Sequence, residues 1–311
     1  MLTEALALAD ADDQALVGRV TLYKNMLAVT KLRVVAIQLL AAAMQCAEFQ
    51  TQEHVAMRMR IISVYFKCLY SSSEEVVAVA YDSLKATLAQ QSKLPKDLLR
   101  SGLQPILMTL ADRHRLTSAG LDGLAHLLQL LTNYFKVEIG IKLLDHLSAL
   151  AEPAMLRRAA AGPLDTHEKL RILTAIVRVF HLLPDTAYQF LPRLLVYVAE
   201  IESHLRRSGP TPLTDMLTLF LDHFSEHTVR YYFESDGHVR FTDVLQNPRL
   251  FRLLRLALQS PRGASLRREL SRRAETLFLP LLSDASNTQS VYAALQLICL
   301  LYTSPSPRDQ R

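Results

Sequence analysis

Residues 116–150, LTSAGLDGLAHLLQLLTNYFKVEIGIKLLDHLSAL, carry the pattern that decides the fold. Apolar side chains recur there at steps of three and four residues, which is the spacing of one face of an α-helix. The pattern predicts a helix, a tight corner at residues 133–136 and a second helix. Each helix has two adjacent apolar stripes, namely Leu121, Leu124, Leu128, Leu131 and Phe135 beside Leu127, Leu130 and Tyr134, and then Val137, Ile141 and Leu144 beside Leu143, Leu147 and Leu150. We therefore expect both helices to be buried on two sides.

Such a helix needs neighbours in order to be stable. Burying four leucines contributes about 6–12 kcal/mol, whereas ordering the residues of the helix costs roughly 18–36 kcal/mol. Three glycines, Gly120, Gly123 and Gly140, lie inside these two helices, although glycine in a helix costs about 1 kcal/mol relative to alanine. We expect them to mark places where backbones approach closely.

The composition favours helix along the whole chain. Half of the 311 residues are apolar and only 9 are glycine, which leaves few turns for an all-β fold. The apolar runs are shorter than the roughly 18 residues of a membrane span, and the N-terminus lacks the basic region of a secretory signal. We expect no membrane partner. Cys46, Cys68 and Cys299 are isolated on apolar stretches, and we expect buried thiols in a reducing compartment.

Helical patterns recur at nearly regular intervals. Further helices are expected at residues 15–29, 31–49, 53–69, 74–91, 95–111, 166–183, 184–207, 212–224, 225–234, 249–259, 266–282 and 286–302, with a loop between 153 and 163. The first helices of successive pairs start 36 to 49 residues apart, which brackets the roughly 40–47 residues of HEAT or armadillo repeats. The sequence therefore predicts an all-α, HEAT/armadillo-like α-solenoid of antiparallel helix pairs.

We expect this solenoid to occupy residues 1–302. Neither end has an evident capping repeat, so the array is expected to be a fragment of a longer one. Residues 303–311, TSPSPRDQR, lose the apolar period abruptly. We interpret them as a non-native-looking disordered tail and exclude them from the fold.

One short pattern resembles a catalytic motif. His223, Glu226 and His227 form the H-x-x-E-H spacing of inverted zinc proteases. We expect Ser225 to be the N-cap of a new helix, so that the pattern straddles a break and the histidines diverge. The P-loop, dinucleotide-binding, nucleophile-elbow and kinase motifs are missing from the sequence. We predict no metal site, no cofactor and no enzymatic activity.

Charge gathers in one stretch of the chain. Residues 249–273 hold eight arginines against the single acid Glu269, a local charge of +7 in a chain of net charge +5. Three interpretations remain open: a solvated or packed face, a site for an acidic protein partner, or a site for nucleic acid. No interleaved aromatic platform is present, which disfavours direct nucleic-acid recognition. The candidate binding residues are Arg249, Arg252, Arg255, Arg267, Arg268, Arg272 and Arg273.

Three segments also resemble a known family. KLRVVAIQLLAAAMQCAEF (31–49), residues 92–147 with KLPKDLL and TNYFKVEIG, and KLRILTAIVRVFHLLPDTAYQFLPRLL (169–195) are similar to the helical-repeat region of the transformation/transcription domain-associated protein (TRRAP-like) family. Members of that family are very large, catalytically inactive relatives of the phosphatidylinositol 3-kinase-like kinases. The resemblance spans most of residues 31–283, and the family's pseudokinase domain lies outside this chain.

The resemblance implies a nuclear scaffold rather than an enzyme. It implies a segment of a histone acetyltransferase coactivator complex of the SAGA or NuA4 kind that docks partner subunits and acidic activation domains. Two alternatives remain: the helical arm of an active kinase of the same superfamily, and a cargo-binding transport solenoid. No partner-contact residue of the family is carried over to this sequence, so the arginine set is predicted from charge alone.

Overall fold

The computed structural model describes residues 1–11, 23–71, 73–90, 115–131, 135–235, 238–239, 247–283 and 287–302, together with residues 99, 100, 103, 104, 108, 110 and 112. Within these residues the protein is all-α apart from one short hairpin. The chain divides into two compact units, residues 1–131 and 132–311. The expected helix at 95–111 lies mostly outside the described residues. The tail 303–311, residues 133 and 134 of the expected corner and residues 15–22 of the expected helix at 15–29 also lie outside them.

Unit 1 is a stack of α-helices that pack on their neighbours in sequence. Its helices are α1 (Leu2–Asp10), α3 (Tyr23–Gln45), α4 (Val55–Cys68), α5 (Glu74–Gln90) and α7 (Ser118–Leu131), with 3-10 turns at Ala47–Gln50 and Gln52–His54. Helix α3 contacts α1, α4 and α5, and α5 contacts α7. The two leucine stripes of α7 are largely buried, as the sequence predicted.

Helix α3 is long and apolar enough, by length and composition alone, to cross a membrane. Its window Ala28–Gln45 has a mean hydropathy of 1.3, and 28% of it is buried. Arg33 lies inside this window and is only 4% exposed, and its Nη2 donates a hydrogen bond to the Ala9 carbonyl of α1 at 3.2 Å. The Cys68 thiol donates to the same carbonyl at 3.3 Å. These polar contacts join α3 and α4 to the C-terminal end of α1, where a helix carries partial negative charge.

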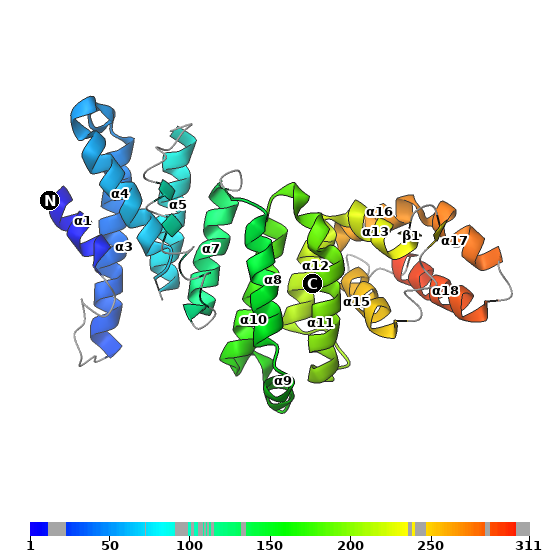
Figure 1. Cartoon of the computed structure of the whole chain (residues 1–311). Helices are drawn as coiled ribbons and strands as arrows, with labels where there is room; N and C mark the ends of the chain where they lie inside the picture. The colour runs from blue at the N-terminus through cyan, green and yellow to red at the C-terminus, as the bar shows by residue number, and fades with distance from the viewer. Residues whose placement is uncertain are drawn as a thin grey trace. The chain divides into compact units, whose positions relative to one another are not determined.

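Unit 2 repeats the same arrangement with more helices (Figure 1). It contains α8 (Glu138–Leu150), α9 (Pro153–Ala160), α10 (Glu168–Val179), α11 (Leu191–Leu205), α12 (Pro212–His223), α13 (Ser225–Phe233), α15 (Pro248–Gln259), α16 (Ala264–Arg272), α17 (Ala274–Ser283) and α18 (Thr288–Tyr302). Short 3-10 turns occur at Leu164–Thr166, Phe180–Leu182 and Asp185–Phe190, and β1 (Glu234–Ser235) pairs antiparallel with β2 (His238–Val239).

Successive helix pairs of unit 2 stack on one another. Helices α10, α12, α15 and α18 contact one another in that order, and α13 contacts α16 alongside them. Buried aromatic rings join neighbouring segments: the ring centroid of Phe180 lies 5.8 Å from that of Phe190 and 6.1 Å from that of Phe220, both in edge-on geometry. Each pair is thus buried by its neighbours, which confirms the predicted all-α solenoid class.

Two of the three glycines confirm the expected close approaches. A Cβ on Gly123 of α7 would lie 2.6 Å from the Tyr70 ring and 2.8 Å from the Leu69 carbonyl oxygen, and a Cβ on Gly140 of α8 would lie 2.3 Å from the Phe190 ring. At Gly120 the nearest atom is Thr117 Oγ1 at 3.1 Å, a contact at the start of its own helix. Glycine is therefore required at positions 123 and 140 to admit a neighbouring residue.

Several predicted element boundaries are wrong. The expected break before residue 31 does not exist, because Tyr23–Gln45 contains neither glycine nor proline and forms one helix. The predicted loop after residue 153 is helix α9, since Pro153 occupies the first turn and Met155, Leu156 and Ala159 are buried. The predicted helix at 266–282 is divided into α16 and α17, because Arg273 leaves helical geometry with φ −100° and ψ 4°.

Three expected burials are also wrong. Ile141 is 44% exposed, because Ile139, Leu143, Leu144 and Leu147 provide the buried face of α8. Cys68 is buried as expected, but Cys46 and Cys299 are exposed. Both exposed thiols lie on the outer faces of their segments, which an apolar sequence pattern alone does not distinguish from the inner ones.

We predict that Gly140→Ala lowers the free energy of unfolding of the 311-residue chain by about 1–3 kcal/mol, despite the higher helix propensity of alanine. The added methyl group displaces Phe190, whose ring packs against Phe180. Urea denaturation followed by circular dichroism measures the change. Gly162→Ala is the matched control, since no atom lies within 4 Å of its added Cβ. Equal stabilities of the two variants would contradict the close approach.

Candidate docking surface on the arginine-rich helices

Six of the seven candidate arginines lie on two consecutive helices of unit 2, and the seventh directly follows the second helix. Arg249, Arg252 and Arg255 are on α15, Arg267, Arg268 and Arg272 are on α16, and Arg273 is the residue between α16 and α17. The structure separates them by what their guanidinium groups contact.

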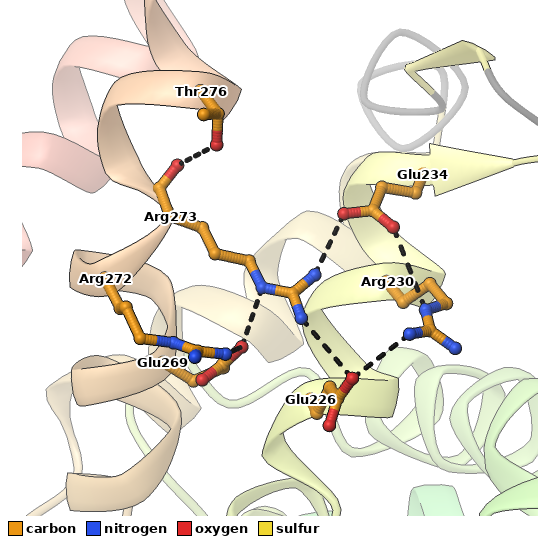
Figure 2. Close-up of polar contacts among 7 residues, drawn as sticks. All are labelled: Glu226, Arg230, Glu234, Glu269, Arg272, Arg273 and Thr276. Atoms are coloured by element: carbon orange, nitrogen blue, oxygen red, sulfur yellow. Dashed lines mark hydrogen bonds and ion pairs between the residues drawn. The ribbon is translucent and has the colours of Figure 1, made fainter.

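Arg273 is the centre of an ion-pair cluster (Figure 2). Its Nε lies 2.7 Å from Glu269 Oε1, its Nη1 3.0 Å from Glu234 Oε1, and its Nη2 3.5 Å from Glu226 Oε1. Two more arginines share these carboxylates, Arg272 with Glu269 at 2.8 Å and Arg230 with Glu226 at 3.1 Å. We call Glu226, Arg230, Glu234, Glu269, Arg272 and Arg273 the Arg273 cluster.

The Arg273 cluster joins two helix pairs and is electrically balanced. Its three guanidinium groups face three carboxylates, drawn from α13, β1 and α16. The hydrogen bond from Arg272 is the largest influence that lowers the pKa of Glu269 below its ordinary value. Because Arg273 is 20% exposed and Glu269 14% exposed, solvent screens their pairing less than it screens a pair at the surface. Arg272 and Arg273, which the sequence predicted to bind a partner, are thus neutralised by carboxylates of the chain itself.

Arg267 stabilises the end of a helix. Its Nη1 donates hydrogen bonds to the carbonyl oxygens of Leu258, at 2.8 Å, and Ser260, at the C-terminus of α15. Backbone carbonyls there have no partner within the helix, and a cation near them also interacts favourably with the helix dipole.

Arg252 reaches into the preceding repeat. Its Nη1 lies 3.7 Å from Glu202 Oε2 of α11, and its Nη2 donates to the carbonyl oxygens of Arg207 and Gly209. The Glu202 side chain is only 2% exposed, and its Oε1 accepts a hydrogen bond from the Thr211 hydroxyl. Burial raises the pKa of Glu202, while the Thr211 hydrogen bond and the charge of Arg252 oppose that shift.

The remaining arginines point to solvent. Arg249, Arg255, Arg262 and Arg268 are exposed, and in the described part of the chain no carboxylate pairs with them. Arg268 donates only to Ser265 Oγ at 3.2 Å. Among the arginines of residues 249–273, these four are the ones that are exposed and have no carboxylate partner in the described residues. One of them, Arg262, was not among the seven candidates.

A groove lies beside these arginines, between α15 and α18, with a volume of about 350 Å³. Its lining consists of Pro248, Phe251, Arg252, Arg255, Gln289, Tyr292, Ala293 and Gln296. The residues of the α18 wall were not among the predicted site residues. The signal for it lies in Gln289, Tyr292 and Gln296, polar and aromatic residues that follow the helical period, of which the first two are exposed and the third is partly buried.

The H-x-x-E-H pattern is divided between two helices, as predicted. Helix α12 ends at His223 and α13 begins at Ser225. The N-cap is Phe224 and not Ser225, so that detail of the prediction is wrong. The His227 ring stacks on Tyr188 at 4.0 Å, and the carboxylate of Glu226 pairs with arginines of the Arg273 cluster. Within the residues that the structure describes, no group of three potential ligands could hold a metal ion.

Comparisons with known proteins agree on one family. The family model of the Tra1 HEAT repeat ring region matches residues 1–306. The Tra1 subunit of the SAGA complex and NuA4 acetyltransferase complex of Schizosaccharomyces pombe is 41% identical over 254 residues, which cover 80% of this chain and 7% of that protein. The corresponding subunit of Saccharomyces cerevisiae is 40% identical over 235 residues, which cover 75% of this chain and 6% of that protein.

A vertebrate relative is more distant. The transformation/transcription domain-associated protein of Danio rerio is 25% identical over 295 residues, which cover 93% of this chain and 7% of that protein. The chain therefore spans only 6% to 7% of the length of these relatives.

We predict that Arg273→Met lowers the free energy of unfolding by about 1–3 kcal/mol, because three carboxylates lose a charged hydrogen-bond donor. Arg268→Met, the exposed control, is expected to change it by less than about 0.5 kcal/mol. Urea denaturation at low salt and at about 1 M NaCl measures the free energy of unfolding of both variants. The loss of stability caused by Arg273→Met should be smaller at high salt, because salt screens the ion pairs. Equal effects at both positions would contradict a structural role for the Arg273 cluster.

We predict that Glu202→Gln becomes more stable relative to the unchanged chain as the pH rises. The pKa of Glu202 is raised in the folded state above its ordinary value of 4.5. Its protonated form therefore contributes stability below the unfolded pKa, and that contribution is lost as pH rises through the folded pKa. Glutamine keeps an acceptor for Thr211 without a buried charge.

Urea denaturation across acidic to neutral pH measures this dependence. The control is Glu200→Gln, which changes an exposed carboxylate on the same helix. Parallel pH profiles for Glu202→Gln and the unchanged chain would show that Glu202 titrates normally.

Proposed function

Because the chain belongs to the family of the Tra1 HEAT repeat ring region, we propose that it is a non-catalytic scaffold segment of a histone acetyltransferase coactivator complex. The observation that carries this proposal is the family match over residues 1–306 together with 41% identity to a SAGA and NuA4 subunit. The resemblance expected from the sequence is thereby confirmed.

The architecture supports a docking role. In each unit the helices contact near neighbours in sequence, so the chain presents extended helix faces. The sequence contains no P-loop, dinucleotide-binding, nucleophile-elbow or kinase motif, and the matched region is a repeat array rather than a kinase domain. A scaffold therefore fits better than an enzyme, and the helical arm of an active kinase and a cargo-binding solenoid are the weaker proposals.

The relatives point to the site of action. The curated yeast relatives are named as subunits of the SAGA and NuA4 complexes. Acetylation of chromatin takes place in the nucleus, and we extend that location to this protein. Its proposed partners are the other protein subunits of such a complex and acidic activation segments of transcription factors.

Four exposed arginines support acidic activation segments as partners. Arg249, Arg255, Arg262 and Arg268 are exposed without a carboxylate partner among the described residues, and a cationic surface accelerates encounter with acidic segments. Of the other candidates, Arg252, Arg267, Arg272 and Arg273 have intramolecular partners. We propose the exposed set as the part that attracts a partner.

Affinity purification of the tagged full-length protein that carries this chain tests the scaffold role. We expect histone acetyltransferase activity and acetyltransferase subunits in the eluate, and no phosphate transfer from ATP to protein beyond that of a mock purification. Acetyltransferase activity should persist through a second purification step by size. A stable assembly that contains no acetyltransferase or deubiquitinase subunit would overturn the proposal.

A further inference from the structure

The groove between α15 and α18 has two walls of different chemistry. Both walls are single helix faces, since their lining residues follow steps of three, four and seven. The two helices contact each other and lie beside each other in unit 2 (Figure 1). The groove is therefore a feature of neighbouring repeats and not of a loop.

The α15 wall combines an aromatic ring with positive charge. It consists of Pro248, Phe251, Arg252 and Arg255. Arg252 is fixed by Glu202 and by two carbonyl oxygens of the preceding repeat, whereas Arg255 is exposed and has no carboxylate partner in the described residues. None of the described residues that line the groove is acidic, so its electrostatic complement is an acidic ligand.

The α18 wall combines a large exposed ring with two neutral amides. Tyr292 is 65% exposed, although tyrosine at a surface usually covers a neighbour with its ring. Ala293 beside it is 3% exposed, and its small side chain leaves the groove open at that point. Gln289 and Gln296 flank Tyr292 on the same face. Each amide offers a donor and an acceptor, as a peptide group does.

The spacing of the two amides fits an extended chain. Seven residues of α-helix rise by about 10 Å, and an extended peptide covers that distance in about three residues. Two glutamines on one face can thus hydrogen bond to the backbone of one bound segment, while Tyr292 and Phe251 contact an apolar side chain between them.

We propose that this groove binds an extended acidic segment of another protein, with the ligand carboxylates at Arg252 and Arg255, its backbone at Gln289 and Gln296, and an apolar side chain against Tyr292 and Phe251. The inference rests on the proposed scaffold function and names the place and manner of docking. Only acidic segments that also carry large apolar residues fit both walls. A nucleic acid would satisfy the arginines but leaves the two amides and their spacing without a role.

Fluorescence anisotropy with the 311-residue chain tests the groove. The probe is a fluorescein-labelled peptide of repeated Asp-Phe-Glu-Leu, and a second peptide of repeated Asp-Ser-Glu-Ser keeps the charge without the apolar residues. We expect the second peptide to bind at least tenfold more weakly, a loss of about 1.4 kcal/mol. Equal affinities would overturn the apolar part of the proposal.

Charge-neutral variants separate the groove from general attraction to arginine. Tyr292→Ala and the double variant Gln289→Ala with Gln296→Ala are each expected to weaken binding of the first peptide about tenfold. The matched control is Tyr302→Ala, which removes another exposed tyrosine, 74% exposed, from the same helix outside the groove. Equal affinities of the Tyr292→Ala and Tyr302→Ala variants would overturn the proposal.

A polyanion and the full-length protein complete the test. Unlabelled single-stranded oligothymidylate should compete poorly with the peptide at physiological salt, and competition as strong as that of unlabelled peptide would favour a nucleic-acid surface instead. The full-length protein carrying Tyr292→Ala should still purify with acetyltransferase activity. If the variant loses acetyltransferase activity, Tyr292 acts in complex assembly and the docking role is overturned. If the unchanged protein itself purifies without acetyltransferase activity, the proposed function is refuted.

Discussion

Arginine side chains tie one repeat of unit 2 to the next at two places. Arg207 Nη2 donates to the carbonyl oxygens of Ala160 at 3.0 Å and Gly162 at 2.9 Å, at the C-terminal end of α9. Arg252 in turn donates to the carbonyl oxygens of Arg207 and Gly209. Donors and acceptors lie 43 to 47 residues apart, which is one repeat. Carbonyls that end a helix need such partners, so the same bonds satisfy one repeat and orient the next.

Apolar side chains of one segment are likewise buried only by contact with neighbouring segments. The Phe190 ring fits the space left by Gly140 of α8 and meets Phe180, which meets Phe220 of α12. None of these segments buries its rings alone. Stability in such an array is close to a sum of repeats and their interfaces, so a change at one interface weakens its own neighbours first.

The sequence predicted helices and their period well, because burial on a helix face leaves a regular trace in residues such as Leu121, Leu124 and Leu128. It failed where tertiary contacts decide. The break at Arg273 has no glycine or proline to announce it and coincides with a cluster whose partners Glu226 and Glu234 lie on another helix pair. The charge of residues 249–273 was counted correctly, but counting within one segment could not find carboxylates some forty residues earlier.

In a repeat protein, the arginines of one segment can divide between structural and docking roles. An arginine-rich segment read alone suggests a uniform cationic face, yet in the folded chain some arginines hold repeats together and the remainder face outward. Arg252 belongs to both groups, because Glu202 of the preceding repeat fixes the guanidinium that forms part of the groove wall. A preorganised cation loses less side-chain entropy when it binds a ligand. The geometry of the groove therefore depends on how the repeats stack. Binding of a ligand there would depend on that stacking as well as on the residues that line the groove.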